Sequence, residues 1–193
     1  MLINLTRPVV LLASSRPTGN TFALAKLMFA DDSTPVVDLA ALNIGYYSYS
    51  NAHADDDFLP LVEQLMMSPV GVLATPLYWY SMSAQAKTFL DRLSDLLSFR
   101  KALGCQLRGK GFAVVCAGSD PGLPPSFNQP FELSCSYLGM HFLGSCYAQF
   151  DGDQLVNADA ATAATEFGAT IHREAHRGTT RSQSSPDARI KFS

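Results

Sequence analysis

The sequence predicts an α/β protein with an open, five-stranded parallel sheet and helices on both faces. Short apolar runs rich in β-branched residues alternate with longer segments of helical periodicity along nearly the whole chain. One of these runs, 70–74, is apolar throughout, as expected of a parallel strand that is covered on both faces. Right-handed crossovers between such strands place helices on both sides of the sheet.

The predicted elements follow one another in a regular order. The first strand, 8–13, leads through a polar segment into a helical stripe that ends at Phe29. A second strand fits 34–38, and three aspartates after the next polar loop favour the start of a helix, which Pro69 ends. The remaining elements are a strand over 70–74, a helix over 84–97, a strand over 111–117, a helix over 127–138, a strand over 141–149 and an alanine-rich helix over 158–176.

The length and charge of the chain limit its class. With 193 residues it has the size of one domain and buries enough surface to need neither disulfides nor a structural metal. We expect one domain over 1–177 and a mobile polar tail over 178–193, because that final segment lacks hydrophobic periodicity. Lys and Arg number 14 against 17 Asp and Glu, a net charge of −3, so the basic excess of a nucleic-acid-binding domain is absent.

Neither a membrane nor a metal is an expected partner. No apolar run approaches the roughly 18 to 20 residues that span a bilayer, and the apolar core of the amino-terminal segment is short. We therefore expect a cytoplasmic protein. The cysteines show no CxxC pair and no histidine neighbour at zinc-ligand spacing. Buried free thiols are the interpretation that we favour for Cys105, Cys116, Cys135 and Cys146.

The loops after the first, third and fourth strands are the candidate site, because ligands of open α/β sheets bind beyond the carboxyl ends of the strands. The first loop opens directly into a helix and combines hydroxyl and amide side chains with an arginine and a glycine. Backbone N–H groups at a helix start, hydroxyls and a guanidinium all favour an anion, and Gly19 allows close backbone approach. We interpret this loop as a phosphate cradle formed by Ser14, Arg16, Thr18, Gly19, Asn20 and Thr21.

Two better-known phosphate motifs are absent from the chain. The sequence has no GxxxxGK[ST], and no GxGxxG follows the first strand. A nucleoside triphosphatase site and a Rossmann dinucleotide site are therefore disfavoured. The alternative for the loop itself is that Thr18, Gly19 and Asn20 only form a turn and cap a helix, as such residues often do.

The loop after the third strand is aromatic where loops are usually polar. Tyr78, Trp79 and Tyr80 stand together beside Leu77. Consecutive aromatic side chains offer stacking surface to a flat ring system, and exposed backbone amides can face polar ring atoms. The alternative is a hydrophobic interface patch, since aromatic residues are also enriched in protein contacts, and the two uses can coexist. The loop after the fourth strand is small and polar, which suits close backbone approach to a ring edge.

Two motifs resemble those of a known family. The segment ASSRPTGNT after the first strand and the segment TPLYWYSMSAQAKTFLDR after the third are similar to those of flavodoxin-like NAD(P)H-dependent FMN reductases and quinone reductases. The resemblance in element order covers about 8–175. The matching positions are Ser14, Arg16, Gly19, Asn20 and Thr21 in the first motif and Thr75, Pro76, Tyr78, Lys87, Phe89, Asp91 and Arg92 in the second.

The resemblance implies a flavodoxin-like fold and a bound FMN. The six residues of the first loop would hold its phosphate. The isoalloxazine ring would be flanked by Pro76, Leu77, Tyr78, Trp79, Tyr80 and Ser81, and Ala117, Gly118 and Ser119 match a loop that approaches the pyrimidine side of the flavin. We interpret Lys87, Asp91 and Arg92 as structural, with an ion pair that ties their helix down. The dispersed cysteines leave no ligand set for an iron–sulfur cluster.

The implied activity is that of an FMN-dependent NAD(P)H oxidoreductase. Hydride passes from the nicotinamide to the flavin, and two electrons then pass to a small acceptor such as a quinone, a flavin, an azo compound or a nitro compound. The flavin carries the chemistry, so we expect no catalytic side chain and no metal. The family also implies a homodimer or homotetramer. Two alternatives stay open: a flavodoxin-type electron carrier, against which the net charge of −3 argues mildly, and a flavodoxin-fold interaction protein without turnover.

Overall fold

The computed structural model describes residues 7–29, 34–156 and 158–183, and its centre is one sheet with the strand order β2-β1-β3-β4-β5-β6. The first five strands are parallel, and β6 pairs antiparallel with the end of β5. The open α/β sheet is therefore confirmed, with six strands rather than the five expected. The additional strand has only two residues, too few for an alternating pattern. The strands are β1 (Val9–Leu12), β2 (Val36–Asp38), β3 (Val70–Pro76), β4 (Gly111–Gly118), β5 (His141–Asp151) and β6 (Gln154–Leu155).

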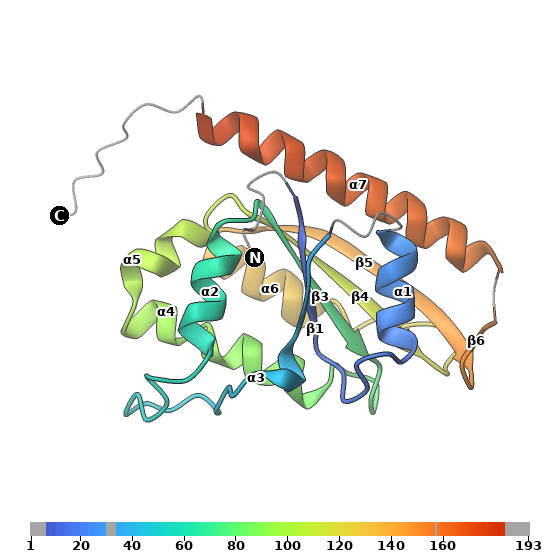
Figure 1. The fold of residues 1–193 in the computed structure, drawn as a ribbon, viewed down its shortest axis with the longest axis horizontal. Helices are drawn as coiled ribbons and strands as arrows, with labels where there is room; N and C mark the ends of the chain where they lie inside the picture. Colours follow the sequence, from blue (N-terminus) through green and yellow to red (C-terminus); the bar gives the residue numbers. More distant parts are fainter. Residues whose placement is uncertain (1–6, 30–33, 157, 184–193) are drawn as a thin grey trace.

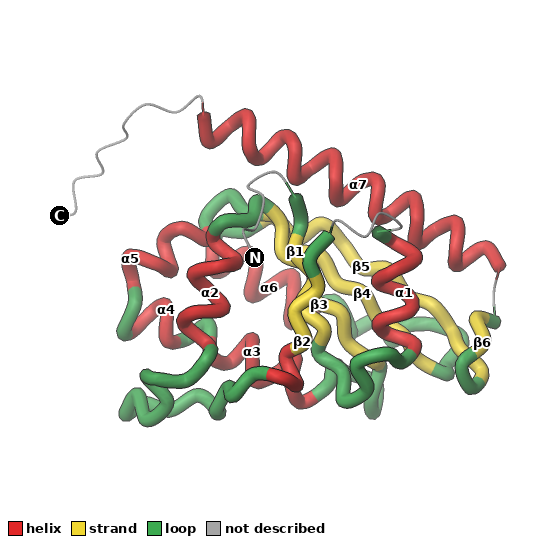
Figure 2. The backbone as a smooth tube through the Cα atoms, in the orientation of Figure 1, coloured by secondary structure: helices red, strands yellow, loops and turns green. Residues whose placement is uncertain are grey.

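Helices cover both faces of the sheet (Figures 1 and 2). One face carries α1 (Asn20–Met28) and α7 (Ala158–Gln183). The other carries α2 (Phe58–Met66), α3 (Ala84–Arg92) and α6 (Gln129–Leu138). The shorter elements are η1 (Leu39–Ala41), α4 (Asp95–Ser98), α5 (Lys101–Gly104) and η2 (Cys105–Leu107).

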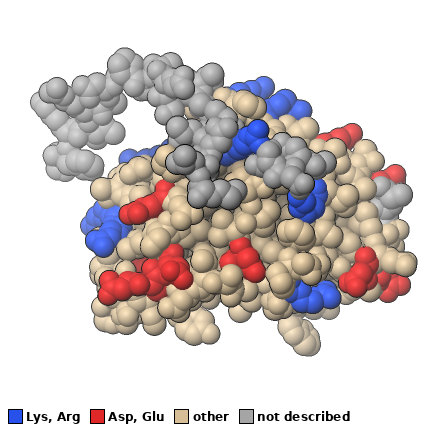
Figure 3. Space-filling model, in the orientation of Figure 1, with Lys and Arg blue, Asp and Glu red and all other residues tan. Residues whose placement is uncertain are grey.

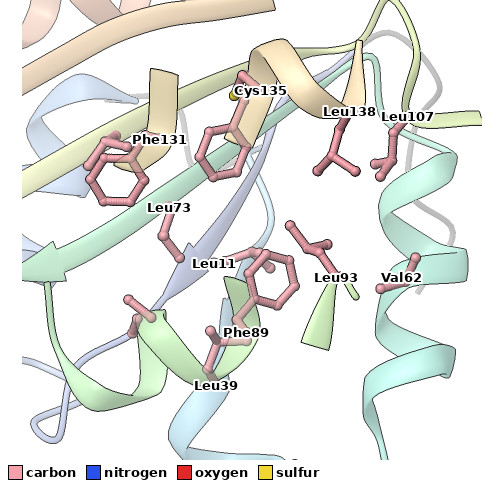
Figure 4. Close-up of a cluster of buried hydrophobic side chains, with 14 of the residues drawn as sticks. Leu11, Leu39, Val62, Leu73, Phe89, Leu93, Leu107, Phe131, Cys135 and Leu138 are labelled. Atoms are coloured by element: carbon pink, nitrogen blue, oxygen red, sulfur yellow. The ribbon is translucent and has the colours of Figure 1, made fainter. Parts of the chain in front are cut away.

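Each face of the sheet has its own hydrophobic core. Leu11 of β1 belongs to the cluster beneath α2, α3 and α6, part of which is drawn in Figure 4. Its neighbours Val10 and Leu12 belong to the cluster beneath α1 and α7. Successive side chains of a strand point to opposite faces, so a strand covered on both faces is apolar throughout. This explains the continuous apolar runs in the sequence.

Two helices end more than two residues away from the expected position. The helix expected over 84–97 ends at Arg92, and the N–H groups of Leu93 and Ser94 donate to Leu90 and Asp91 in a tightened last turn. Leu93 and Leu97 continue the apolar stripe beyond this turn, so the end of the helix cannot be recognised from the sequence pattern.

The last helix runs to Gln183 rather than 176, so part of the expected tail is helical, and 184–193 lie outside the described residues. It crosses α1 so closely that a Cβ on Gly168 would lie 2.0 Å from the carbonyl oxygen of Met28. Among the helices of the described segments, none is long and apolar enough to cross a membrane.

A bulge interrupts the pairing of β4 with β5. Phe112 faces Phe142, whereas Val114 faces Ser145, so β5 contains one extra residue at this point. Gly144 lies in the bulge with a φ of 101°, a conformation that L side chains rarely adopt. The bulge therefore depends on glycine.

Arg92 is a buried hub at the end of α3. Its Nε donates to Asp95 at 2.8 Å. Its two terminal nitrogens both donate to the carboxylate of Asp56, and they also donate to the backbone carbonyls of Gly45 and His53. These contacts use all five N–H donors of the guanidinium. The structural role expected for Arg92 is confirmed, and it extends to fixing the loop between η1 and α2.

Asp56 is the anionic half of this hub. Acidic side chains gather at the lower left of the face shown in Figure 3, where Figure 1 places the segment before α2. Burial opposes ionisation of Asp56, but hydrogen bonds from Arg92 and from the N–H groups of Phe58 and Gly45 outweigh it, so the carboxyl pKa lies below its ordinary value of 3.8. A carboxyl whose pKa is lowered by folding stabilises the fold above its unfolded pKa, and this stabilisation is lost as the pH falls through the folded pKa.

We expect Asp56→Asn to lower the free energy of unfolding at neutral pH by about 3 kcal/mol, because it leaves the buried guanidinium with only one of its two charge partners, Asp95. We also expect the variant to lose part of the wild-type decline in stability below about pH 5, where the unfolded carboxyl begins to bind a proton before the folded one does. Urea unfolding at several pH values measures both effects. Asp55→Asn is the matched control, because Asp55 is exposed and its replacement should change stability by less than about 0.5 kcal/mol. An Asp56→Asn profile parallel to that of the wild type would contradict the prediction.

Candidate functional site

The three predicted loops begin side by side at the carboxyl edge of the sheet. β1, β3 and β4 are neighbours, with Leu12 paired to Ala74 and Pro76 paired to Ala117. The loops that follow these strands therefore leave the sheet at one edge, the lower edge in Figure 1.

Ser83 ties the first loop to the third. Its hydroxyl donates to the carbonyl of Ala13 at 2.7 Å and accepts the N–H of Ala86, which caps α3. Its own N–H donates to the hydroxyl of Thr75 at 2.9 Å. Ser83 and Thr75 are buried, so water does not compete for these bonds. The ends of β1 and β3 and the start of α3 are thus held as one unit.

The loop after β1 leads into the start of α1, where no side chain caps the helix. Gly19 occupies the N-cap position of α1, and no side chain caps the helix there. The backbone N–H groups of Asn20, Thr21 and Phe22 donate to no residue that the structure describes. The positive end of the α1 dipole is therefore available to an anion. Ser14 and Thr21 lie buried at the base of the loop, whereas Arg16 and Thr18 are exposed at its rim.

The β5–β6 hairpin contacts this loop, a neighbour that the sequence did not predict. The side-chain amide of Asn20 donates to the carbonyl of Gly152 at 2.8 Å. Arg16 lies 3.7 Å from the carboxylate of Asp153. Both charged side chains of this pair are mostly exposed, so the pair contributes little to stability and leaves Arg16 able to meet another anion.

The aromatic loop forms a tight turn with left-handed backbone. Tyr78 and Ser81 exchange two backbone hydrogen bonds of 2.9 and 3.0 Å. The two central residues, Trp79 and Tyr80, have φ values of 50° and 64°. A turn with positive φ at both central residues normally contains Asn and Gly, so bulky side chains here carry backbone strain. The Trp79 side chain is 94% exposed, so packing does not offset the strain.

A cleft of about 370 Å³ lies between the aromatic turn and the loop after β4. Its lining includes five of the predicted residues, Leu77, Tyr78, Trp79, Tyr80 and Ser119, together with Asp120, which was not predicted. Pro76 and Ala117 are buried at the ends of their strands, and Ser81 closes the turn. The loop after β1 leaves the same edge of the sheet, but none of its residues lines this cleft.

Gly118 is the point where the cleft wall meets β5. A Cβ on Gly118 would lie 2.9 Å from both the Cβ of Leu77 and the hydroxyl of Tyr147. That hydroxyl donates to the carbonyl of Asp120 at 2.6 Å, and the Gln149 amide donates to the carbonyl of Ser119 at 2.9 Å. Only their spacing of two residues on the last long strand connects Tyr147 with Gln149 in the sequence, and that signal is too general to have identified them.

The cysteines and metal-binding side chains add nothing to the site. Cys116, Cys135 and Cys146 are buried, as expected, whereas Cys105 is exposed, so the expected burial is wrong for that residue. Burial raises the pKa of Cys135 to about 12 and that of Cys146 to about 11, so both are neutral thiols at physiological pH. Across 7–29, 34–156 and 158–183, no group of three or more His, Cys, Asp or Glu could hold a metal ion.

Comparison with known families decides the assignment. A family model described as NADPH-dependent FMN reductase matches residues 6–154, which include all three loops. The chain belongs to this family. The description of the family names FMN as the flavin and NADPH as the reductant.

Among proteins with known annotation, this FMN reductase family member is similar to YwqN of Bacillus subtilis strain 168, which is named as an NAD(P)H-dependent FMN-containing oxidoreductase. The two are 29% identical over 123 residues, which cover 58% of this chain and 65% of YwqN. The chain thus spans less than two thirds of the length of this relative.

Solved structures share the fold. The Trp repressor binding protein from Bacillus subtilis superposes with a TM-score of 0.68 at 23% identity, over 83% of this chain and 97% of that one. A WrbA-like flavodoxin from Agrobacterium tumefaciens gives a TM-score of 0.65 at 18% identity, over 89% and 98%. The flavodoxin-like fold that the sequence predicted is confirmed.

The strain in the aromatic turn gives a testable prediction. We expect Trp79→Gly to be more stable than Trp79→Ala by roughly 1 kcal/mol, because glycine accepts the left-handed conformation and alanine does not. Tyr49 is the matched control position: it is 91% exposed and is not among the residues with positive φ. There the alanine variant should be at least as stable as the glycine variant. Urea unfolding of the four variants measures the difference, and equal stability of the two Trp79 variants would count against a strained turn.

Proposed function

We propose that this chain is an FMN-dependent NAD(P)H oxidoreductase that reduces a small conjugated acceptor in the cleft beside the aromatic turn. The observation that carries the proposal is the position of the open α1 start and the aromatic cleft at one edge of the sheet, within the segment that matches the family. FMN has an anionic end and a flat aromatic end, so it needs both features as neighbours.

The first loop fits the phosphate of FMN. The unpartnered N–H groups of Asn20, Thr21 and Phe22 donate to its oxygens, and the dipole of α1 favours its charge. Thr18 supplies a hydroxyl at the rim and Arg16 supplies a positive charge. Ser14 accepts the N–H of Arg16 and so shapes the loop from beneath. Asn20 contributes its backbone, because its side chain is held by the β5–β6 hairpin.

The cleft fits the ring system. Its volume lies within the range of ligand pockets in proteins, and three of its six lining residues are aromatic. Leu77 and Tyr78, which follow β3, would hold the ring from one side, and Ser119 and Asp120, which follow β4, would hold it from the other. Pro76, Ala117 and Gly118 lie behind these residues and keep the two walls at a fixed separation.

Bound FMN would supply the redox chemistry, which is hydride acceptance from a nicotinamide and two-electron reduction of the acceptor. The residues of the chain orient the two substrates and exclude water, and no side chain is required as a catalytic acid. Trp79 and Tyr80 are the most exposed aromatic residues of the cleft and form the stacking surface for the acceptor. A quinone, a free flavin, an azo compound or a nitro compound has the flat, conjugated shape that this surface accepts.

Exposed aromatic residues also support assembly with further copies of the chain. Trp79, Tyr46 and Tyr49 are each more than three quarters exposed, and aromatic residues are enriched at protein interfaces. We therefore retain a homodimer or homotetramer as part of the proposal.

An absorbance spectrum tests the function. The purified protein is incubated with FMN, desalted and given NADPH or NADH without oxygen. A retained flavin band that bleaches, and returns when a quinone, azo or nitro compound is added, supports the reductase and identifies the acceptor class. A retained band that persists favours an electron carrier. The absence of a band favours an interaction protein and contradicts the proposal.

The phosphate contact yields a separate prediction. We expect Arg16→Ala to weaken FMN binding roughly tenfold, because a charge-assisted hydrogen bond is lost, and to leave the binding of riboflavin, which lacks the phosphate, unchanged. Flavin fluorescence titration measures both dissociation constants. Arg100→Ala is the control, since Arg100 is an exposed arginine on a different loop. An equal loss for both flavins would show that Arg16 acts on the ring or on the fold instead.

A further inference from the structure

The wall of the cleft that β4 supplies is held from behind by two side chains of β5. Tyr147 and Gln149 lie two residues apart, so both point to the same side of the strand. The Tyr147 hydroxyl donates to the carbonyl of Asp120 at 2.6 Å, and the Gln149 amide donates to the carbonyl of Ser119 at 2.9 Å. Two successive carbonyl groups of one loop are thus drawn toward β5.

This arrangement fixes the direction of one peptide group. In a trans peptide the carbonyl of one residue and the N–H of the next point in opposite directions. Because the carbonyl of Ser119 points toward Gln149, the N–H of Asp120 points away from β5. Ser119 and Asp120 also line the cleft, and the N–H of Asp120 donates to no residue of the described segments. Pro121 follows and has no N–H, so Asp120 is the last donor of this strand end.

Gly118 shows that the arrangement is closely fitted. The Tyr147 hydroxyl, which bonds to Asp120, lies next to Gly118. A Cβ at position 118 would be 2.9 Å from the oxygen of that hydroxyl. Burial is the main reason that the pKa of Tyr147 rises to about 12, so the hydroxyl is protonated and can donate at neutral pH. The Gln149 bond is more exposed and is independent of the first.

We propose that Tyr147 and Gln149 are positioning residues, which hold the carbonyl groups of Asp120 and Ser119 against β5 and so aim the N–H of Asp120 into the cleft, as a donor to the pyrimidine edge of the flavin. The inference rests on the proposed function, because it requires FMN in the cleft. A donor at that edge stabilises the negative charge of the reduced flavin more than the neutral oxidised ring. The two side chains therefore set the reduction potential of the flavin as well as its affinity.

The test uses Tyr147→Phe and Gln149→Met, with Tyr137→Phe as the matched control. Tyr137 is a 77% exposed tyrosine on α6, so it reports the effect of losing a phenolic hydroxyl away from the cleft. We expect each β5 variant to weaken FMN binding by roughly three- to tenfold, as for one hydrogen bond, and to weaken riboflavin binding by the same factor, since the phosphate loop is untouched. We expect the midpoint potential of the bound flavin to become more negative in both variants and to stay at the wild-type value in Tyr137→Phe.

A direct observation of the peptide complements the titrations. In the amide NMR spectrum of the wild type, FMN should protect the Asp120 N–H from exchange with solvent, and this protection should decrease in both β5 variants. Melting temperatures show whether Tyr147→Phe is destabilised. Because the Gln149 hydrogen bond is exposed, Gln149→Met should fold normally and can test the proposal even if Tyr147→Phe folds poorly.

The possible failures are distinguishable. If the wild type binds no FMN, the proposed function fails. If the wild type binds FMN while both variants retain its affinity, potential and Asp120 protection, the positioning role is overturned and the function stands. A loss of affinity without any change in potential or protection would also overturn it, because that result describes a structural role only.

Discussion

The geometry of the site depends on a few buried hydrogen bonds that join the ends of neighbouring strands. The Ser83 hydroxyl accepts the N–H of Ala86 at the start of α3 and donates to the carbonyl of Ala13, the residue after β1. The backbone N–H of Ser83 donates to the hydroxyl of Thr75 in β3. Parallel strands bring three loops to one edge, but they do not fix how the loops lie relative to one another. Ser83 fixes the loop after β1 relative to the start of α3, and Arg92 fixes the loop before α2 relative to the end of α3. These bonds fix the position of the loop that leads into α1 relative to the loop that carries the aromatic turn.

The aromatic turn differs from this rigid frame. Trp79 and Tyr80 adopt left-handed backbone that glycine or asparagine would adopt more easily, and their rings are largely exposed. Backbone strain at exposed residues is typical of functional sites, which agrees with the proposal that these rings contact a ligand or a second copy of the chain. The frame behind the turn, from Thr75 to Ser83, is buried and hydrogen-bonded. Strain is thereby confined to the tip, where it does not propagate into the sheet.

The fold was predictable because its signals are local. Continuous apolar runs identified the parallel strands, and the loops that follow β1 and β3 carried recognisable motifs. The break after Arg92 was missed because Leu93 and Leu97 continue the apolar stripe of the helix. The contacts of Asn20 with Gly152, and of Tyr147 with Asp120, join residues that are far apart in the chain. Hydrophobic periodicity does not predict a side chain that bonds to a distant backbone carbonyl. These contacts of the site could therefore be identified only from the structure.

The bulge in β5 has a consequence for the solubility of the protein. β5 pairs with β6 at Phe150 and Asp151, and the carbonyl of Gln149 accepts the N–H of Val156. Within the described segments, no strand pairs with the outer edge of β5 before Gln149. An exposed flat edge is a template on which another chain can add a strand, which is how many aggregates begin. The extra residue at Gly144 twists the edge out of the regular register that an incoming strand needs. We therefore expect the bulge at Gly144 to make strand addition at the β5 edge less favourable than at a flat, regular edge.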